Sequence, residues 1–154
     1  MQIKHSLTFE ATTEQIIAAL LSEELAAKRM ALFGVTDFTH RIDGTTATTD
    51  ATVPPEKFPS QVRSFLKSAA YVTVTQQAGG DVITLSVDPH GLPAELAGTI
   101  ELTAGSPTVA ELVADLKVRI PIVGGKIERK ASDRVGRLLA RDQQLVAEVI
   151  SERG

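Results

Sequence analysis

Apolar and polar residues alternate along most of this chain, at the period of a β-strand that buries one face. The first such run is residues 2–10, where Ile3, His5 and Leu7 share the apolar face. Short segments with glycine or proline separate the later runs and favour antiparallel connections. The pattern predicts about six further strands, at residues 38–42, 45–53, 71–77, 82–88, 96–102 and 112–120.

Two regions carry the spacing of an amphipathic helix instead. After the first strand, Thr12 and Gln15 match a capping box, and helical spacing continues to Gly34 with a bend near Ser22. Two short helices are therefore expected there. The second region, residues 123–154, predicts one long helix with a narrow apolar face. That face comprises Ile127, Ala131, Val135, Leu138, Leu145 and Val149.

The order of these elements predicts the fold class. Strands that follow one another, with the helices grouped apart, are typical of an α+β domain. In such a domain a curved antiparallel sheet packs one face on the long helix. A chain of 154 residues has the length of one ordinary domain, so residues 1–154 are expected to form a single domain.

Composition and charge argue against several functional classes. A net charge of −3 argues against a nucleic-acid-binding protein, which usually carries a basic excess on one face. Cysteine is absent, which excludes disulfides, thiolate metal sites and cysteine nucleophiles. No run approaches the ~20 apolar residues of a membrane-spanning helix, and the chain starts without a signal-peptide pattern. We therefore expect no stable membrane insertion and a cytoplasmic location.

No metal or cofactor is expected from the motifs. The histidines, His5, His40 and His90, lack the spacing of a metal site. The pair Gly124 and Gly125 precedes a lysine, but the other features of a phosphate loop are missing. A dinucleotide glycine fingerprint is also missing.

Asp142 is the main candidate for chemistry because it interrupts the apolar face of the long helix, between Leu138 and Leu145. A carboxylate aimed at the sheet must be neutralised, paired or hydrated. For a functional role, His5 and His40 are the best candidate partners, since each is in phase with the apolar set of its strand. The structural interpretation is that Asp142 reaches the open end of the groove, pairs with a nearby arginine and only fixes the position of the helix, and this is the favoured interpretation.

A basic stripe along the same helix has two interpretations. It can attract an acidic ligand, a partner protein or an anionic membrane, or it can be a solvated edge whose alkyl stems cover apolar surface. The solvated edge is the favoured interpretation. The stripe consists of Lys126, Lys130, Arg134, Arg137 and Arg141.

The whole order of elements resembles the START and birch-pollen-allergen-like superfamily (SRPBCC), also called the helix-grip fold. In that fold a curved sheet of seven strands wraps around the C-terminal helix. More narrowly, residues 118–128 before the helix and residues 54–66 between the third and fourth strands resemble a bacterial family of unknown function within it. The resemblance implies a cavity for an apolar or amphiphilic ligand between sheet and helix, and it brings no catalytic motif.

Three functions follow from these observations. The first is a binding or carrier protein for a small hydrophobic or amphiphilic ligand, such as a lipid or a polyketide. The second is a cyclase-like or hydrolase-like enzyme that uses Asp142 with His5 or His40. The third is a protein-interaction domain without a ligand, favoured if the residues around Leu25, Met30 and Phe33 are exposed. The candidate ligand-binding residues are Asp142, His5, His40, Tyr71, Leu138 and Leu116.

Overall fold

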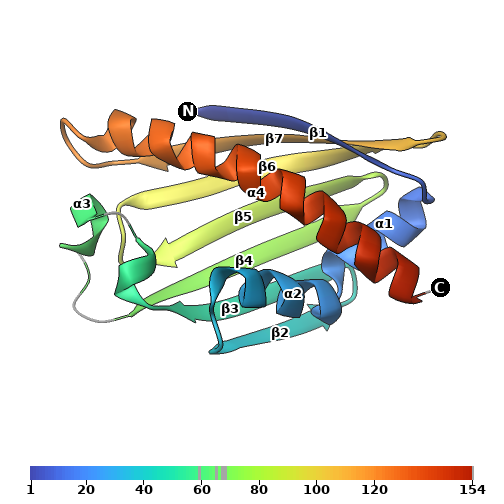
Figure 1. Cartoon of the computed structure of the whole chain (residues 1–154), viewed down its shortest axis with the longest axis horizontal. Coiled ribbons are helices and arrows are strands. Elements are labelled where there is room, and N and C mark those ends of the chain that lie inside the picture. The colour runs from blue at the N-terminus through green and yellow to red at the C-terminus, as the bar shows by residue number, and fades with distance from the viewer. Residues whose placement is uncertain (59, 65, 67–68, 154) are drawn as a thin grey trace.

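One face of a seven-stranded sheet is crossed diagonally by a long helix, α4, in the computed structural model, which describes residues 1–58, 60–64, 66 and 69–153 (Figure 1). The strands are β1 (Gln2–Phe9), β2 (Phe38–Asp43), β3 (Thr46–Val53), β4 (Ala70–Gly79), β5 (Val82–His90), β6 (Ala94–Thr103) and β7 (Thr108–Val118). The helices are α1 (Thr13–Leu21), α2 (Glu23–Phe33), the 3₁₀ turn η1 (Pro55–Lys57), α3 (Ser60–Arg63) and α4 (Gly124–Arg153).

The sheet is antiparallel throughout and follows the order β1-β7-β6-β5-β4-β3-β2. Strands β2 to β7 form a meander, and β1 then pairs with β7, with Gln2 opposite Asp115. Helices α1 and α2 connect β1 and β2, which are the two edge strands. The predicted α+β helix-grip fold, with a curved sheet, two short early helices and a long C-terminal helix, is confirmed.

Ser22 divides the early helical region, as its sequence pattern predicts. Its Oγ donates to the carbonyl of Ala19 at 2.7 Å and accepts from the backbone N–H of Leu25 at 3.2 Å. One serine thus ends α1 and begins α2. The capping box of Thr12 and Gln15 is also present at the start of α1.

The hydrophobic core lies where α1, α2 and the last turns of α4 meet the sheet. Val146 and Val149 of α4 are fully buried there, together with Ile16 of α1 and Leu25 of α2. The cluster is completed by Phe9, Ala19, Leu20, Ile83, Leu102 and Ala110. The long helix is therefore anchored mainly through its C-terminal turns.

The start of α4 is held against the end of β7. The Glu128 carboxylate accepts a hydrogen bond from the backbone N–H of Val118 at 2.9 Å, and Ile127 is buried. A Cβ at Gly124 would lie 2.5 Å from the carbonyl oxygen of Val118, so only glycine allows this close approach. None of the helices in the described part of the chain combines the length and the hydropathy that a membrane-spanning helix requires.

Candidate ligand-binding site

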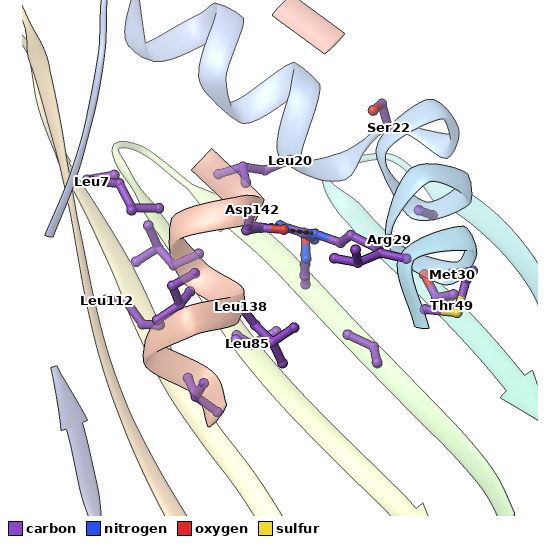
Figure 2. A pocket seen from close by; sticks show the side chains of 18 of the residues that line it. Leu7, Leu20, Ser22, Arg29, Met30, Thr49, Leu85, Leu112, Leu138 and Asp142 are labelled. Atoms are coloured by element: carbon purple, nitrogen blue, oxygen red, sulfur yellow. Dashed lines mark hydrogen bonds and ion pairs between the residues drawn. The ribbon is translucent and has the colours of Figure 1, made fainter. Parts of the chain in front are cut away.

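A pocket of about 270 Å³ lies beneath the middle of α4, between this helix, α2 and the sheet (Figure 2). Its walls are mainly aliphatic. The middle of α4 contributes Val135, Leu138, Leu139 and Asp142. The apolar residues from the strands are Leu7, Phe9, Val74, Leu85, Ile100, Ala110 and Leu112. Helix α2 contributes Ala26, Arg29, Met30, Leu32 and Phe33.

Asp142 is paired across the pocket wall with Arg29 of α2. The Nε and Nη2 of Arg29 donate to the two carboxylate oxygens of Asp142, each at 2.7 Å (Figure 2). The side chains are 23% and 18% exposed, so this bidentate pair is partly shielded from water. The favoured interpretation, an arginine partner for Asp142, is confirmed, and the functional hypothesis of a histidine partner is wrong. Sequence spacing gave no signal for Arg29, because only the packing of α2 on α4 brings the two residues together.

His40 lines the same pocket, but both of its ring nitrogens already have partners. Nε2 lies 2.9 Å from the carbonyl of Leu21, which can only accept, so this nitrogen donates. Nδ1 lies 2.8 Å from the hydroxyl of Thr49, and in the neutral ring it accepts from that hydroxyl. These bonds tie β2 and β3 to the end of α1 and occupy the groups that proton transfer would need.

Gln76 of β4 is a further pocket residue that the sequence pattern does not single out. The residue is 7% exposed and lines the pocket. Its Oε1 atom is buried and has no hydrogen-bond partner within the described part of the chain. An amide oxygen buried without a partner is unfavourable by roughly 1–3 kcal/mol. The signal in the sequence was a glutamine in phase with the inward residues Val72 and Val74.

Three of the predicted site residues lie outside this pocket. His5 shares the inner face of β1, but Leu7 and Phe9 are the β1 residues that reach the pocket. Leu116 lies farther along β7, opposite Leu96, and Leu112 takes the corresponding place in the wall. Of the predicted residues, the structure therefore brings Asp142, His40 and Leu138 together.

Tyr71 is the third residue outside the pocket, and it belongs to the opposite face of the sheet. It is out of phase with Val74 and Gln76, which face the pocket, and it is 49% exposed. Its ring lies 5.2 Å from the ring of His90, centroid to centroid. Burial raises the pKa of the Tyr71 phenol, and the nearby Asp50 carboxylate raises it further.

Asp50 organises a polar cluster on that outer face. The hydroxyl of Thr73 donates to Asp50 at 2.8 Å, and Arg41 lies 3.1 Å from its other oxygen. The Thr73 hydrogen bond is the main cause that lowers the pKa of Asp50, with smaller contributions from Tyr71 and Arg41. The Nε2 of His90 also lies 2.8 Å from the Thr73 hydroxyl. This cluster lies across the sheet from the pocket.

Two further sequence features have clear positions. All five residues of the basic stripe on α4 are exposed, as expected for a solvated edge. Leu25 is completely buried, Met30 lines the pocket, and Phe33 is 41% exposed, so these three residues do not form an exposed patch. Among the residues that the structure describes, no group of three or more acidic or histidine side chains could hold a metal ion.

Comparison with protein families identifies the chain. The model of a family described as "Protein of unknown function (DUF2505)" matches residues 4–150. The chain belongs to this family. Among curated proteins, none matches the sequence significantly.

Solved structures that resemble this DUF2505 chain share its fold at low sequence identity. TTHA0849 from Thermus thermophilus has a TM-score of 0.68 and 12% identity, with 100% of this chain and 99% of that chain covered. A START superfamily protein from Mycobacterium smegmatis has a TM-score of 0.61 and 9% identity, with 99% of both chains covered. The predicted START-like fold and the predicted membership of a family of unknown function are confirmed.

An enzyme is also among the similar structures. Norcoclaurine synthase from Thalictrum flavum, in complex with dopamine and hydroxybenzaldehyde, has a TM-score of 0.60 and 16% identity. The alignment covers 100% of this chain and 88% of the synthase. At this identity the likeness shows the common fold alone.

Proposed function

We propose that this protein binds and carries a small hydrophobic or amphiphilic molecule, lipid-like or polyketide-like, in the pocket between the sheet and α4. The observation that carries this proposal is the pocket of about 270 Å³ with predominantly aliphatic walls. Its volume lies near the lower end of the range for ligand sites, and few polar groups face it. Burial of an apolar guest against these walls supplies the driving force for binding.

An enzyme that uses Asp142 and His40 has less support, although a similar structure belongs to an enzyme. Asp142 already accepts two hydrogen bonds from Arg29, and both nitrogens of His40 are engaged. A general acid or base must reach the reacting proton, which these contacts oppose. The protein-interaction alternative has lost its supporting feature, since Leu25 is buried and Met30 lines the pocket.

The proposal is tested with N-phenyl-1-naphthylamine, an uncharged probe whose fluorescence rises in an apolar site. We expect saturable binding to the wild-type protein at one site. Leu138→Trp places a larger side chain in the pocket wall and should weaken binding at least about 10-fold. Circular dichroism establishes that the variant is folded.

Ala140→Trp is the matched control, because Ala140 lies on the exposed side of the same helix. This variant should bind the probe with the affinity of the wild type. Native mass spectrometry of protein purified without denaturation provides a second measurement, in which a co-purified small molecule is expected. Absence of probe binding together with absence of a retained molecule would overturn the proposed function.

A further inference from the structure

Gln76 gives this otherwise aliphatic pocket a specific chemical requirement. The residue is more than nine-tenths buried and lines the pocket, and its Oε1 has no partner among the described residues. A buried amide oxygen is a hydrogen-bond acceptor that has been removed from water. Rotation of the amide about its last side-chain bond, a soft torsion, turns this oxygen toward the pocket, where an O–H or N–H group of a guest would satisfy it.

The other uncharged polar side chains of the pocket do not compete with Gln76 for the O–H or N–H group of the guest. The hydroxyl of Ser22 donates to Ala19 and accepts from the N–H of Leu25. The hydroxyl of Thr49 bonds to His40, whose second nitrogen bonds to a backbone carbonyl. These side chains are therefore used in holding the elements together, which leaves Gln76 as the polar anchor for a guest.

The charged residues of the pocket wall indicate that the guest is uncharged. Arg29 and Asp142 are the charged side chains in the wall, and they neutralise one another through two hydrogen bonds of 2.7 Å. A carboxylate or phosphate headgroup would have to break this pair to obtain a counter-ion, or would remain unpaired in an apolar site. A fatty-acid anion is therefore disfavoured.

We propose that the pocket selects an uncharged amphiphile with a hydroxyl group, which donates a hydrogen bond to Oε1 of Gln76 while its apolar body lies against the aliphatic walls. Fatty alcohols, terpenoid alcohols and uncharged hydroxylated polyketides belong to this class. The inference rests on the proposed function and adds the polarity and charge of the ligand.

Three probes with eight carbon atoms each test it by isothermal titration calorimetry: 1-octanol, its isomer 1-methoxyheptane, and octanoate. The isomers contain the same atoms, but the ether cannot donate a hydrogen bond. We expect 1-octanol to bind about 5-fold more tightly than 1-methoxyheptane, the size of one hydrogen bond in a shielded site. Octanoate is expected to bind at least about 10-fold more weakly than 1-octanol at pH 7.

Gln76→Met keeps a side chain of similar length but removes the amide. This variant should bind both isomers with affinities that differ by less than about 2-fold. Gln77→Met is the matched control, because Gln77 is the adjacent residue on β4 and is exposed, whereas Gln76 is buried. The control should keep the preference of the wild type for 1-octanol.

The outcomes separate this inference from the proposed function. Equal binding of the two isomers, a preference that persists in Gln76→Met, or tighter binding of octanoate would overturn the inference alone. Binding of N-phenyl-1-naphthylamine without binding of any of the three eight-carbon probes would also overturn the inference. Failure of every probe, the naphthylamine included, would overturn the proposed function as well.

Discussion

The last turns of α4 and its middle differ in what lies beneath them, although both belong to one amphipathic helix. Beneath residues 145–150, Val146 and Val149 pack with no exposed surface against Ile16 and Leu25 of the early helices. Beneath residues 135–142, the apolar side chains are only partly buried and face the pocket. The same helix therefore serves as core at one end and as the wall of a cavity in the middle.

This difference teaches that a continuous apolar stripe does not identify what it covers. The helical period of α4 predicts which side chains turn inward, and Val135, Leu138 and Val149 all do so. The number of partners that meet each side chain depends on the sheet and on α2, which are distant in the sequence. The apolar face of a helix therefore does not by itself indicate where a cavity lies.

The largest expected effect is on the free energy of unfolding, when one apolar side chain in each part of α4 is replaced by alanine. Val146→Ala removes two methyl groups from a fully buried site and should lower the free energy of unfolding by about 2–3 kcal/mol. Leu138→Ala should lower it by only about 1 kcal/mol, because it enlarges an existing pocket rather than opening a new cavity. Urea denaturation of both variants measures the contrast, and equal losses would contradict the division of α4 into two parts.

The Arg29–Asp142 pair stands at the boundary between the two parts, and its removal should have the next largest effect. Asp142→Leu leaves Arg29 unpaired and should destabilise the fold by about 2 kcal/mol, less than for a fully buried pair because both side chains keep some exposure. The double variant Arg29→Met, Asp142→Leu should return to within about 1 kcal/mol of the wild type. Strictly additive losses in this double-mutant cycle would show that the ion pair contributes no coupling.

A smaller effect concerns the pKa of Tyr71 on the outer face of the sheet. Binding of a guest in the pocket should not alter this pKa. Tyr71 is the only tyrosine of the chain, so absorbance at 295 nm follows its ionisation alone. Its pKa should lie above the ordinary value of a phenol, because burial and the Asp50 carboxylate both disfavour the phenolate. Asp50→Asn should bring the pKa of Tyr71 closer to the ordinary value. Saturation with 1-octanol should leave this pKa unchanged, and a shift on binding would place the guest elsewhere.

The smallest effect is the contribution of Asp50 to stability at different pH values. Its pKa is lowered in the folded protein, so its charged form stabilises the fold above the pKa of the unfolded state. That stability is lost as the pH falls through the lowered folded-state pKa. The wild type should therefore melt above Asp50→Asn at pH 7, and the difference should shrink toward pH 3. A difference that grows on acidification would contradict the sign of this shift.

Sequence periodicity predicted the fold well because strands, helices and caps depend on neighbouring residues. Ser22, Thr12 and Gln15 act on backbone atoms within three positions of themselves, so their patterns can be recognised directly.

The pocket depends on contacts between distant segments and was predicted less well. The helical period places Asp142 on the inward face of α4, where it lines the pocket, but Arg29 lies 113 positions away and carries no local signal. Gln76 was overlooked because a polar residue within an alternating strand is usually exposed. Whether such a residue lies inside the pocket depends on the face toward which its strand turns, and here Gln76 shares the face of Val74.

The pairing of β1 with β7 has a consequence for synthesis of the protein on the ribosome. The partner of β1 emerges from the ribosome more than one hundred residues after β1 itself, since Gln2 pairs with Asp115. The apolar face of the sheet that packs against α4 stays uncovered still longer, because α4 follows β7 in the chain. A nascent chain with this topology therefore exposes apolar surface until α4 has left the ribosome, and such transiently exposed surface is prone to aggregate.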